Sequence, residues 1–241
     1  MQPLQPDTSF HIFNHANGFE NIFRKEENFY YFLEKYRLYI SPIAETYAYC
    51  LMPNHFHLVV RIRKRAAIEE LIRNKNNFSK VRTDHLNISD NLRNFGKVNS
   101  EGNFGKVLTS NSISDSEIEK YLSKQFANLF SCYTQSFNKV YNRMGSLFIK
   151  NFKRDPIYDK IHFLNAIVYT HRNPIHHGFC KRYEDWEYSS YNEIVNGVCD
   201  LIEISKLLKM TNGLESFIGI HQSALENLVT SYELDIPISH D

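Results

Sequence analysis

Two histidines separated by one residue, His55 and His57, lie in an apolar, β-branched run at residues 52–62. Side chains alternate between the two faces of a strand, so both imidazoles are expected on one face and the apolar side chains on the other. Two imidazoles on one face can share a divalent metal ion if a third group completes the site. Strand histidines are also commonly buried, hydrogen-bonded residues, and in a chain with 11 histidines that structural interpretation stays open.

A second pair of candidate groups, Tyr169 and Asn173, falls in a segment expected to be a helix that Asp159 begins and Pro174 ends. Residues four apart lie one above the other on a helix, so the phenol is expected beside the amide. An amide oxygen is a hard ligand suited to Mg²⁺ or Mn²⁺, and with two imidazoles it leaves positions for water and a phosphate oxygen. The tyrosine oxygen could then attack that phosphate and form a phosphotyrosine.

A structural role is the alternative for these two residues as well. The chain has 15 tyrosines, which are mostly amphipathic core or interface residues, and an Asn-Pro pair commonly ends a helix.

The elements that must position these groups begin in the order β-α-β-β. Ser116 is expected to cap a long amphipathic helix, and a strand-like basic run follows that helix. The predicted strands cover residues 9–13, 46–52, 55–62 and, as the basic run, 148–158, and the predicted helices cover 25–40, 64–80, 116–141 and 159–174.

Two further segments depart from this pattern. Residues 82–114 are rich in Asn, Ser and Gly and contain the string NFGKV twice, which indicates an insertion that forms a hairpin or a mobile loop. The stretch beyond residue 195 is acidic with scattered apolar positions and is predicted to be a small helical appendage. We therefore expect one domain at 1–195 and an appendage at 196–241.

The net charge of +1 conceals a strong segregation of charge along the chain. Residues 61–113 carry a net +6 and residues 139–182 a net +7, whereas residues 183–241 carry −9. Two basic segments on one fold favour a polyanionic partner, although ordinary solvated charge is the alternative.

Several classes of protein are disfavoured. The four cysteines are widely scattered and form no C-x-x-C pair, which argues against a zinc ribbon or a disulfide scaffold. No apolar run is long enough to span a bilayer, and the first residues lack a secretory pattern, so no membrane partner and a cytoplasmic location are expected.

Two strings resemble the signatures of one family. The string YCLMPNHFHLVV at residues 49–60 resembles the HUH motif (His, hydrophobic, His) of the single-tyrosine transposases, particularly the REP-associated tyrosine transposases. The strings YTHRNPIHHGF at 169–179 and DWEYSSY at 185–191 look like that family's second signature. With HIFN at 11–14 and GSLF at 145–148, the similarity spans roughly residues 9–195 in the family's order.

The resemblance implies an α+β fold, namely a ferredoxin-like antiparallel sheet with helices packed on one face, to which the C-terminal helical appendage is added. The two histidines would lie on the open face of the sheet, with the tyrosine on a helix nearby. By position, His55 and His57 would be metal ligands, Tyr169 the nucleophile and Asn173 the third ligand, with Mg²⁺ or Mn²⁺ as the metal.

The implied substrate is single-stranded DNA with hairpins formed by palindromic repeats. Cleavage would leave a 5′-phosphotyrosine and a free 3′-OH, without a nucleotide cofactor, in a monomer or a homodimer. Basic residues near the expected site are the candidate DNA contacts, although a solvated charge is the alternative for each: Arg61, Arg63, Lys150, Lys153, Arg154 and Arg172.

The leading hypothesis is therefore a metal-dependent, transposase-like endonuclease and strand transferase. The first alternative is a domesticated DNA-hairpin-binding protein without turnover. The second is a metallohydrolase of small phosphate esters, which would use the histidines but has no need of Tyr169.

Overall fold

The computed structural model describes residues 2–75 and 112–223, and one antiparallel sheet organises them. The strands lie in the order β2-β3-β1-β4, with the bounds Ser9–His15 for β1, Ala44–Met52 for β2, His55–Ile62 for β3 and Lys153–Ile157 for β4. With one helix after β1 and another between β3 and β4, this is the β-α-β-β-α-β arrangement of ferredoxin-like folds. The predicted α+β fold class is confirmed.

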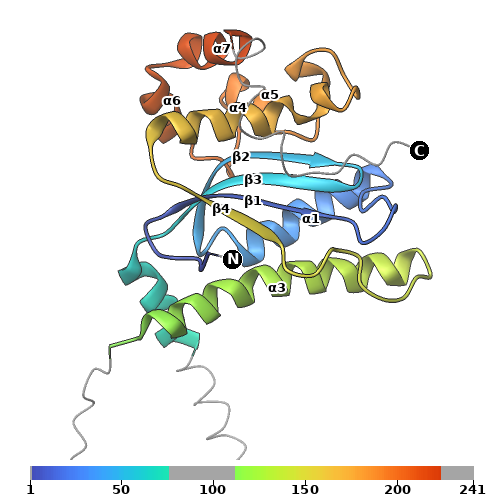
Figure 1. Ribbon diagram of the computed structural model, residues 1–241, viewed down its shortest axis with the longest axis vertical. Helices are drawn as coiled ribbons and strands as arrows, with labels where there is room; N and C mark the ends of the chain where they lie inside the picture. Colours follow the sequence, from blue (N-terminus) through green and yellow to red (C-terminus); the bar gives the residue numbers. More distant parts are fainter. Residues whose placement is uncertain (1, 76–111, 224–241) are drawn as a thin grey trace, which may run out of the picture.

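Helices α1 (Glu26–Tyr39) and α3 (Asp115–Val140) pack side by side beneath one face of the sheet (Figure 1). That face carries the even-numbered apolar side chains of β3, and Phe56 contacts both Phe32 of α1 and Phe130 of α3. The apolar stripe predicted for α3 is buried from Ile118 to Phe137. Its last residue, Val140, is exposed in the final turn of the helix.

The start of α3 differs from the one expected. Ser114 caps α3, not Ser116, because Ser114 Oγ accepts the Glu117 N–H while the Glu117 carboxylate accepts the Ser114 N–H. A helix over residues 65–75 confirms the start of the segment predicted at 64–80. The insertion expected at 82–114 lies outside the described residues except for its last three.

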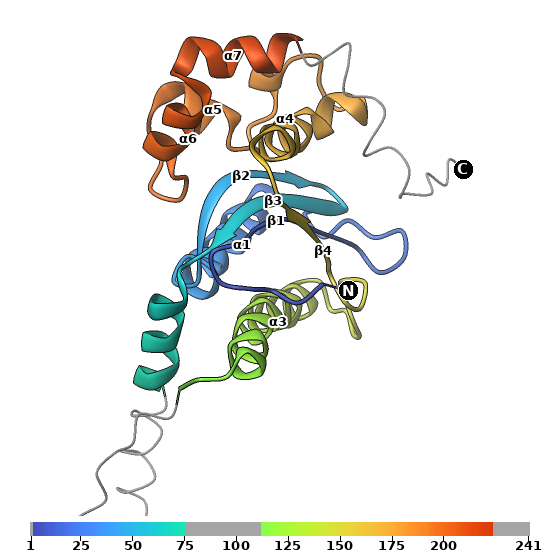
Figure 2. The same cartoon turned by 60° about the vertical axis from the view of Figure 1, so that its left-hand side comes forward.

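Helix α4 (Lys160–His176) lies across the other face of the sheet, over β2 and β3 (Figure 2). Asp159 caps it as predicted, since its Oδ1 accepts the His162 N–H at 2.8 Å. The expected end at Pro174 is wrong: the proline occupies the last turn, where the missing N–H removes a single bond and the His177 N–H still reaches the Asn173 carbonyl. Because α4 covers this face, the histidines do not lie on an open surface.

The segment after α4 runs along the free edge of β2 and covers it. Backbone N–H groups of Leu51 and Ser190 donate to the carbonyls of Tyr188 and Tyr49, and that of Glu203 donates to Thr46. Four short helices follow α4, of which the last two confirm the predicted helical appendage: η1 (Tyr183–Asp185), α5 (Tyr191–Asn196), α6 (Ile204–Thr211) and α7 (Leu214–Ser223). A covered edge cannot pair with another chain. None of the described helices is long and apolar enough to cross a membrane.

A buried chain of hydrogen bonds fastens α7 to α4. His221 Nδ1 faces the Phe217 carbonyl at 2.9 Å and must donate, so its Nε2 accepts from His171 Nδ1 at 2.9 Å. His171 Nε2 then accepts from Ser190 Oγ at 2.8 Å. Burial lowers the pKa of His221 to about 4 and that of His171 well below its usual range, so both imidazoles of this chain are neutral.

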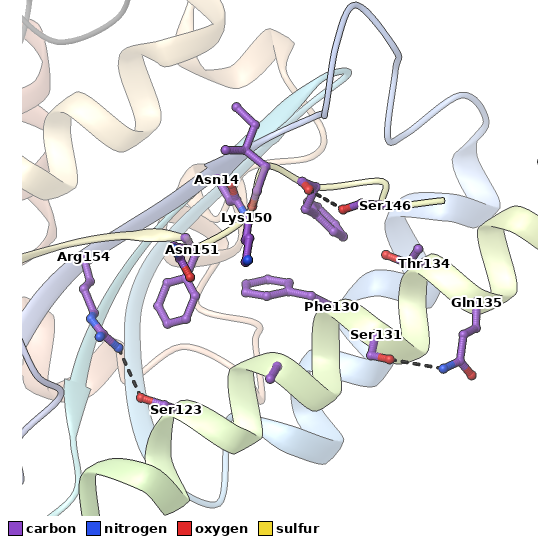
Figure 3. Close-up of a pocket in the computed structure, with 14 residues that line it drawn as sticks. Asn14, Ser123, Phe130, Ser131, Thr134, Gln135, Ser146, Lys150, Asn151 and Arg154 are labelled. Carbon is purple, nitrogen blue, oxygen red and sulfur yellow. Dashed lines mark hydrogen bonds between the residues drawn. The ribbon is translucent and has the colours of Figure 1, made fainter. Parts of the chain in front are cut away.

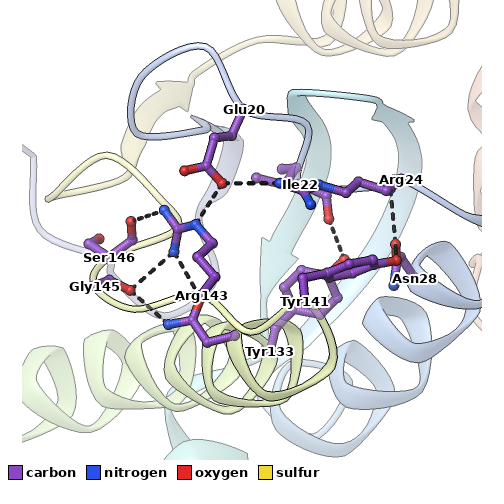
Figure 4. A network of polar contacts seen from close by, with 10 residues as sticks. Glu20, Ile22, Arg24, Asn28, Tyr133, Tyr141, Arg143, Gly145 and Ser146 are labelled. Carbon is purple, nitrogen blue, oxygen red and sulfur yellow. Dashed lines mark hydrogen bonds and ion pairs between the residues drawn. The ribbon is translucent and has the colours of Figure 1, made fainter.

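A second polar network fixes the loops at one end of the sheet (Figure 4). The Arg143 guanidinium donates to Glu20 Oε2 at 2.6 Å, to Asn138 Oδ1 at 2.8 Å and to the Ser146 carbonyl at 2.8 Å. The hydrogen bond from Arg143 lowers the pKa of the Glu20 carboxyl. The network joins the loop after β1 to the segment that leads into β4, and so holds Ser146 in place.

The neutral His221 makes the stability of the fold sensitive to acid. Unfolded histidine has a pKa of about 6.5, so between about pH 6.5 and about pH 4 only the unfolded chain takes up this proton. From this group alone, the free energy of unfolding should fall by roughly 1.4 kcal/mol for each pH unit of acidification within that window. Above about pH 6.5 the His221 proton should have no effect on it. We expect His221→Gln to be less stable than wild type at neutral pH but to lose less stability on acidification, measured by urea unfolding.

The exposed His176 supplies the matched control. His176→Gln should keep both the stability and the pH slope of the wild type, because its side chain is solvated in both states. An unchanged slope in His221→Gln would contradict the assignment.

Candidate metal and nucleophile site

The pairing of β1 with β3 sets two rows of imidazoles side by side. In this register His15 lies opposite His55 and Phe13 opposite His57, so all four side chains share the face under α4. The His15 and His55 rings stack with their centroids 4.5 Å apart. His11, on the same face, places its Nε2 3.0 Å from His57 Nδ1.

Helix α4 brings the second pair of candidate residues onto this face. Asn173 Oδ1 lies 2.7 Å from His55 Nε2, across 118 residues of sequence. The Tyr169 ring stands perpendicular to the His57 ring, with centroids 5.4 Å apart, and edge-on to His11 at 5.7 Å. Both contacts follow from the i, i+4 spacing, which puts Tyr169 and Asn173 on the stripe of α4 that faces the sheet.

Burial keeps these imidazoles uncharged. The side chains of His55 and His57 are 2% and 1% exposed. Desolvation is the largest cause that lowers the pKa of His55 to about 3 and that of His57 well below its usual range, and neighbouring histidines lower both further. The neutral imidazole is the form that binds a metal, so both side chains are in the protonation state that coordination would require.

The surroundings of His55 leave two lone pairs facing each other. Its Nδ1 lies 2.7 Å from Asn54 Oδ1 and its Nε2 lies 2.7 Å from Asn173 Oδ1, yet a neutral imidazole carries one N–H. If Nδ1 donates to Asn54, then Nε2 and the Asn173 oxygen are both acceptors, while Asn173 Nδ2 is buried without a partner among the described residues. Rotating the amide would pair them in metal-free protein, and a cation between them would satisfy both.

The residues present therefore fit a divalent metal ion. His57 Nε2 is also buried without a hydrogen-bond partner in the described part of the chain, and the His55 and His57 ring centroids are 5.2 Å apart. Ligands of an octahedral Mg²⁺ about 2.1 Å from the ion lie about 3 Å apart at right angles, close to the separation of His55 Nε2 and Asn173 Oδ1. Within residues 2–75 and 112–223, no three His, Cys, Asp or Glu side chains form a metal-binding group, and the further oxygen beside His55 is that of the Asn173 amide.

The hydrogen bond between His11 and His57 couples the tautomers of the two rings. When His57 Nδ1 donates to His11 Nε2, the lone pair of His57 is on Nε2, the atom left without a partner. Burial lowers the pKa of His11 to about 3, so that its imidazole is neutral and can accept. In this tautomer His11 would orient the His57 ring.

Two histidines of this cluster, His55 and His57, were predicted from the sequence as site residues, and the others were not. His15 stacks on His55, and the His177 ring lies edge-on to His55 at 5.1 Å. The signal for the β1 residues was available, because His11 and His15 alternate with buried apolar residues as they must on one face of a strand. The alternation did not predict how β1 pairs with β3, so it could not show that His15 lies opposite His55.

The six basic candidates do not gather around the histidines. Lys153 pairs with Phe13 and so lies on the histidine face, and Arg61 lies on that face near the other end of β3, bonded to Asp7 at 2.8 Å. Arg63 donates to the Ser41 carbonyl, which is a structural contact.

The other three basic candidates lie elsewhere. Arg172 is half-buried on α4 and its Nε has no partner among the described residues. Lys150 and Arg154 border a groove on the opposite face of the sheet.

Comparison with solved structures finds a REP-associated tyrosine transposase bound to a REP hairpin. The alignment covers 83% of this chain and 87% of that one, at 14% sequence identity and a TM-score of 0.46. No family model and no curated protein matches the chain. At this identity and TM-score the comparison describes a remote likeness of fold, and no residue assignment rests on it.

Metal binding gives a direct test of the site. Mn²⁺ should raise the melting temperature of the wild type, by an amount that grows with ligand concentration. We expect His57→Ala and Asn173→Ala to lose most of this shift, and Asn173→Asp to enlarge it, because a carboxylate is a stronger ligand for a hard cation than an amide. Thermal melts with and without EDTA provide the measurement.

Tyr169→Phe is the control for that experiment, since it keeps the ring against His57 and removes no proposed ligand. Its Mn²⁺-dependent shift should match the wild type. An equal shift in His57→Ala would rule out this metal site.

Proposed function

We propose that this protein is a metal-dependent endonuclease and strand transferase of single-stranded DNA, transposase-like, that acts through a 5′-phosphotyrosine. One observation supports this most directly: α4 holds Tyr169 against His57 and Asn173 against His55 on a single sheet face. A nucleophile, two neutral imidazoles and an amide oxygen can together support phosphoryl transfer at a divalent metal.

The proposed roles follow from these positions. His55, His57 and Asn173 would hold Mg²⁺ or Mn²⁺, which when bound supplies a Lewis acid for a phosphate oxygen. The Tyr169 oxygen attacks phosphorus, a Tyr–O–P bond forms, and the P–O3′ bond of the DNA breaks. The phenol loses its proton and the leaving 3′ oxygen gains one, so the free 3′-OH can reverse the reaction on another strand.

The proposed substrate is single-stranded DNA that contains palindromic, hairpin-forming elements. Residues 61–113 and 139–182 carry the net positive charge that a polyanion requires. All four proposed groups come from one chain, so a monomer would suffice, and a homodimer would carry two such sites. We place the activity in the cytoplasm.

A second function, hairpin binding without turnover, is favoured by one observation. His55 and His57 are almost fully buried under α4, whereas cleavage requires a phosphate to reach them. A metallohydrolase of small esters is less well supported, because it gives Tyr169 no reason to lie against His57. Cleavage and binding therefore have to be measured separately.

Covalent capture tests the nucleophile. Protein incubated with Mn²⁺ and single-stranded DNA bearing the palindromes that flank its own gene should give an adduct that survives denaturing electrophoresis. Tyr169→Phe should lose this adduct at least a hundredfold, because phenylalanine has no oxygen to attack phosphorus. The matched control is Tyr158→Phe, whose side chain is 76% exposed, and it should form the adduct normally.

His57→Ala supplies a further arm of the same experiment. It should abolish the adduct and leave hairpin binding nearly unchanged, since phosphate contacts from basic residues dominate affinity. Hairpin binding by the wild type with no adduct on any flanking sequence would instead support the second function. An adduct with Tyr169→Phe would show that the nucleophile is a different residue.

The positioning role of His11 makes a separate prediction. His11→Phe keeps a ring in the same volume and removes the acceptor for His57 Nδ1–H, so Mn²⁺ affinity should fall about 10- to 100-fold. His11→Gln retains an acceptor and should recover most of the loss. Calorimetric titration measures the affinity, and imidazole ¹⁵N shifts should show His57 moving toward the Nε2–H tautomer in His11→Phe alone.

Equal Mn²⁺ affinity and an unchanged His57 tautomer in His11→Phe would exclude this role. A loss of affinity that His11→Gln does not recover would assign His11 to packing.

A further inference from the structure

A groove of about 570 Å³ lies between α3 and the segment that leads into β4, on the face of the sheet opposite the histidines (Figure 3). Phe130, Phe148 and Phe152 line it with aromatic rings. Its α3 wall carries small side chains at helical spacing, among them Ser123, Ala127 and Ser131, which leave the space between helix and strand unfilled. The groove is large enough for one nucleotide.

The charge of this groove is positive. Lys150 and Arg154 are its two ionisable residues, and none of the fourteen lining residues is Asp or Glu. In Figure 3 the Lys150 side chain extends across the groove toward Phe130. An anion in the groove would therefore meet two cations, with the carboxylate of Glu119, one turn before Ser123 on α3, acting on the Arg154 charge from outside the lining.

Two contacts hold the Arg154 guanidinium beside the groove, and one of its N–H donors has no hydrogen-bond partner among the described residues. Its Nη1 donates to Ser123 Oγ at 3.2 Å, and its guanidinium lies over the Phe152 ring at 5.2 Å. Its Nε is buried without a hydrogen-bond partner among the described residues. Leaving such a donor unpaired is unfavourable, and a phosphate oxygen is a suitable acceptor for it.

The remaining lining groups suit a nucleobase. Phe130 and Phe152 are each partly exposed, with ring centroids 5.5 Å apart, so a base can stack on either ring. The neighbouring Ser131, Thr134 and Gln135 offer hydroxyl and amide groups to base edges. Aromatic rings beside two cations distinguish a nucleotide from a simple anion or a lipid chain.

The groove and the histidine cluster lie back to back across the sheet. On β1, Asn14 lines the groove while the next residue, His15, stacks on His55. On the edge strand β4, Lys153 lies on the histidine face and Arg154 borders the groove. A DNA strand that crosses the β4 edge would contact both faces within a short length.

We propose that this groove binds one unpaired nucleotide of the DNA strand that is cut at the histidine cluster, with its base on the Phe130 and Phe152 rings and its phosphate between Lys150 and Arg154. The inference rests on the proposed DNA substrate. It adds a second contact site, away from the metal, that would fix the position of the strand.

Fluorescence anisotropy with two probes tests this assignment. One is a labelled single-stranded thymidine oligonucleotide, and the other has the same backbone with abasic sites. Wild type should bind the first about tenfold more tightly. Ser131→Trp, which fills the groove from an exposed position, should remove that preference, and Lys150→Ala should weaken binding of both probes.

Matched variants control for changes of surface and charge. Ser116→Trp, also exposed on α3 but outside the groove, and Lys139→Ala, an exposed lysine of the same helix, should bind as the wild type does. Equal binding by Ser131→Trp and Ser116→Trp would overturn the groove, as would equal affinity of the wild type for the two probes. Melting temperatures confirm folding, and Lys150→Ala serves as the test if Ser131→Trp does not fold.

The outcomes separate this inference from the proposed cleavage. A Tyr169 adduct with unaltered binding by both groove variants would overturn the groove alone. Groove-dependent binding without any adduct would overturn the nuclease and leave the groove. Failure to bind either probe would overturn the groove and leave the proposed cleavage to the adduct experiment.

Discussion

The imidazoles between the sheet and α4 must stay uncharged, and much of this structure depends on that constraint. A protonated histidine in this layer would bring a charge out of water, at a cost of several kcal/mol. Burial accordingly lowers the pKa of His11, His55 and His57. Neutral imidazoles carry one donor and one acceptor each, so packing α4 onto the sheet also fixes which nitrogens are free.

Neutral imidazoles also determine the hydrogen bonds on the side of α4 that faces α7. Hydrogen bonds run from Ser190 through His171 and His221 to the Phe217 carbonyl, and each group donates to the next. This chain can exist in one tautomeric arrangement, because the carbonyl at its end can only accept. Helix α4 therefore lies between two layers of neutral histidine, one toward the sheet and one toward α7. Its position, and with it that of Tyr169 and Asn173, is determined from both sides.

Much of the fold was predictable from periodicity. The apolar stripes of α1 and α3, the strand alternation of β3 and the Asp159 cap are local patterns, and each was confirmed. The errors were local as well: Ser114 competes with Ser116 as a cap, and Pro174 is tolerated inside the last turn of α4. Neither distinction can be made from residue type alone, because both depend on where the helix is held by its neighbours. The boundary proposed at residue 195 stays a prediction.

The candidate site was likewise predictable in its local features and not in its long-range contacts. The sequence by itself determined that His55 and His57 share a face and that Tyr169 and Asn173 share a stripe, because both follow from the fixed repeats of strand and helix. Only the tertiary structure decided that these two pairs meet, that His11 and His15 join them, and that Lys150 and Arg154 lie on the other face. These contacts join residues far apart in the chain, and they are set by strand register and helix packing, which no local repeat specifies.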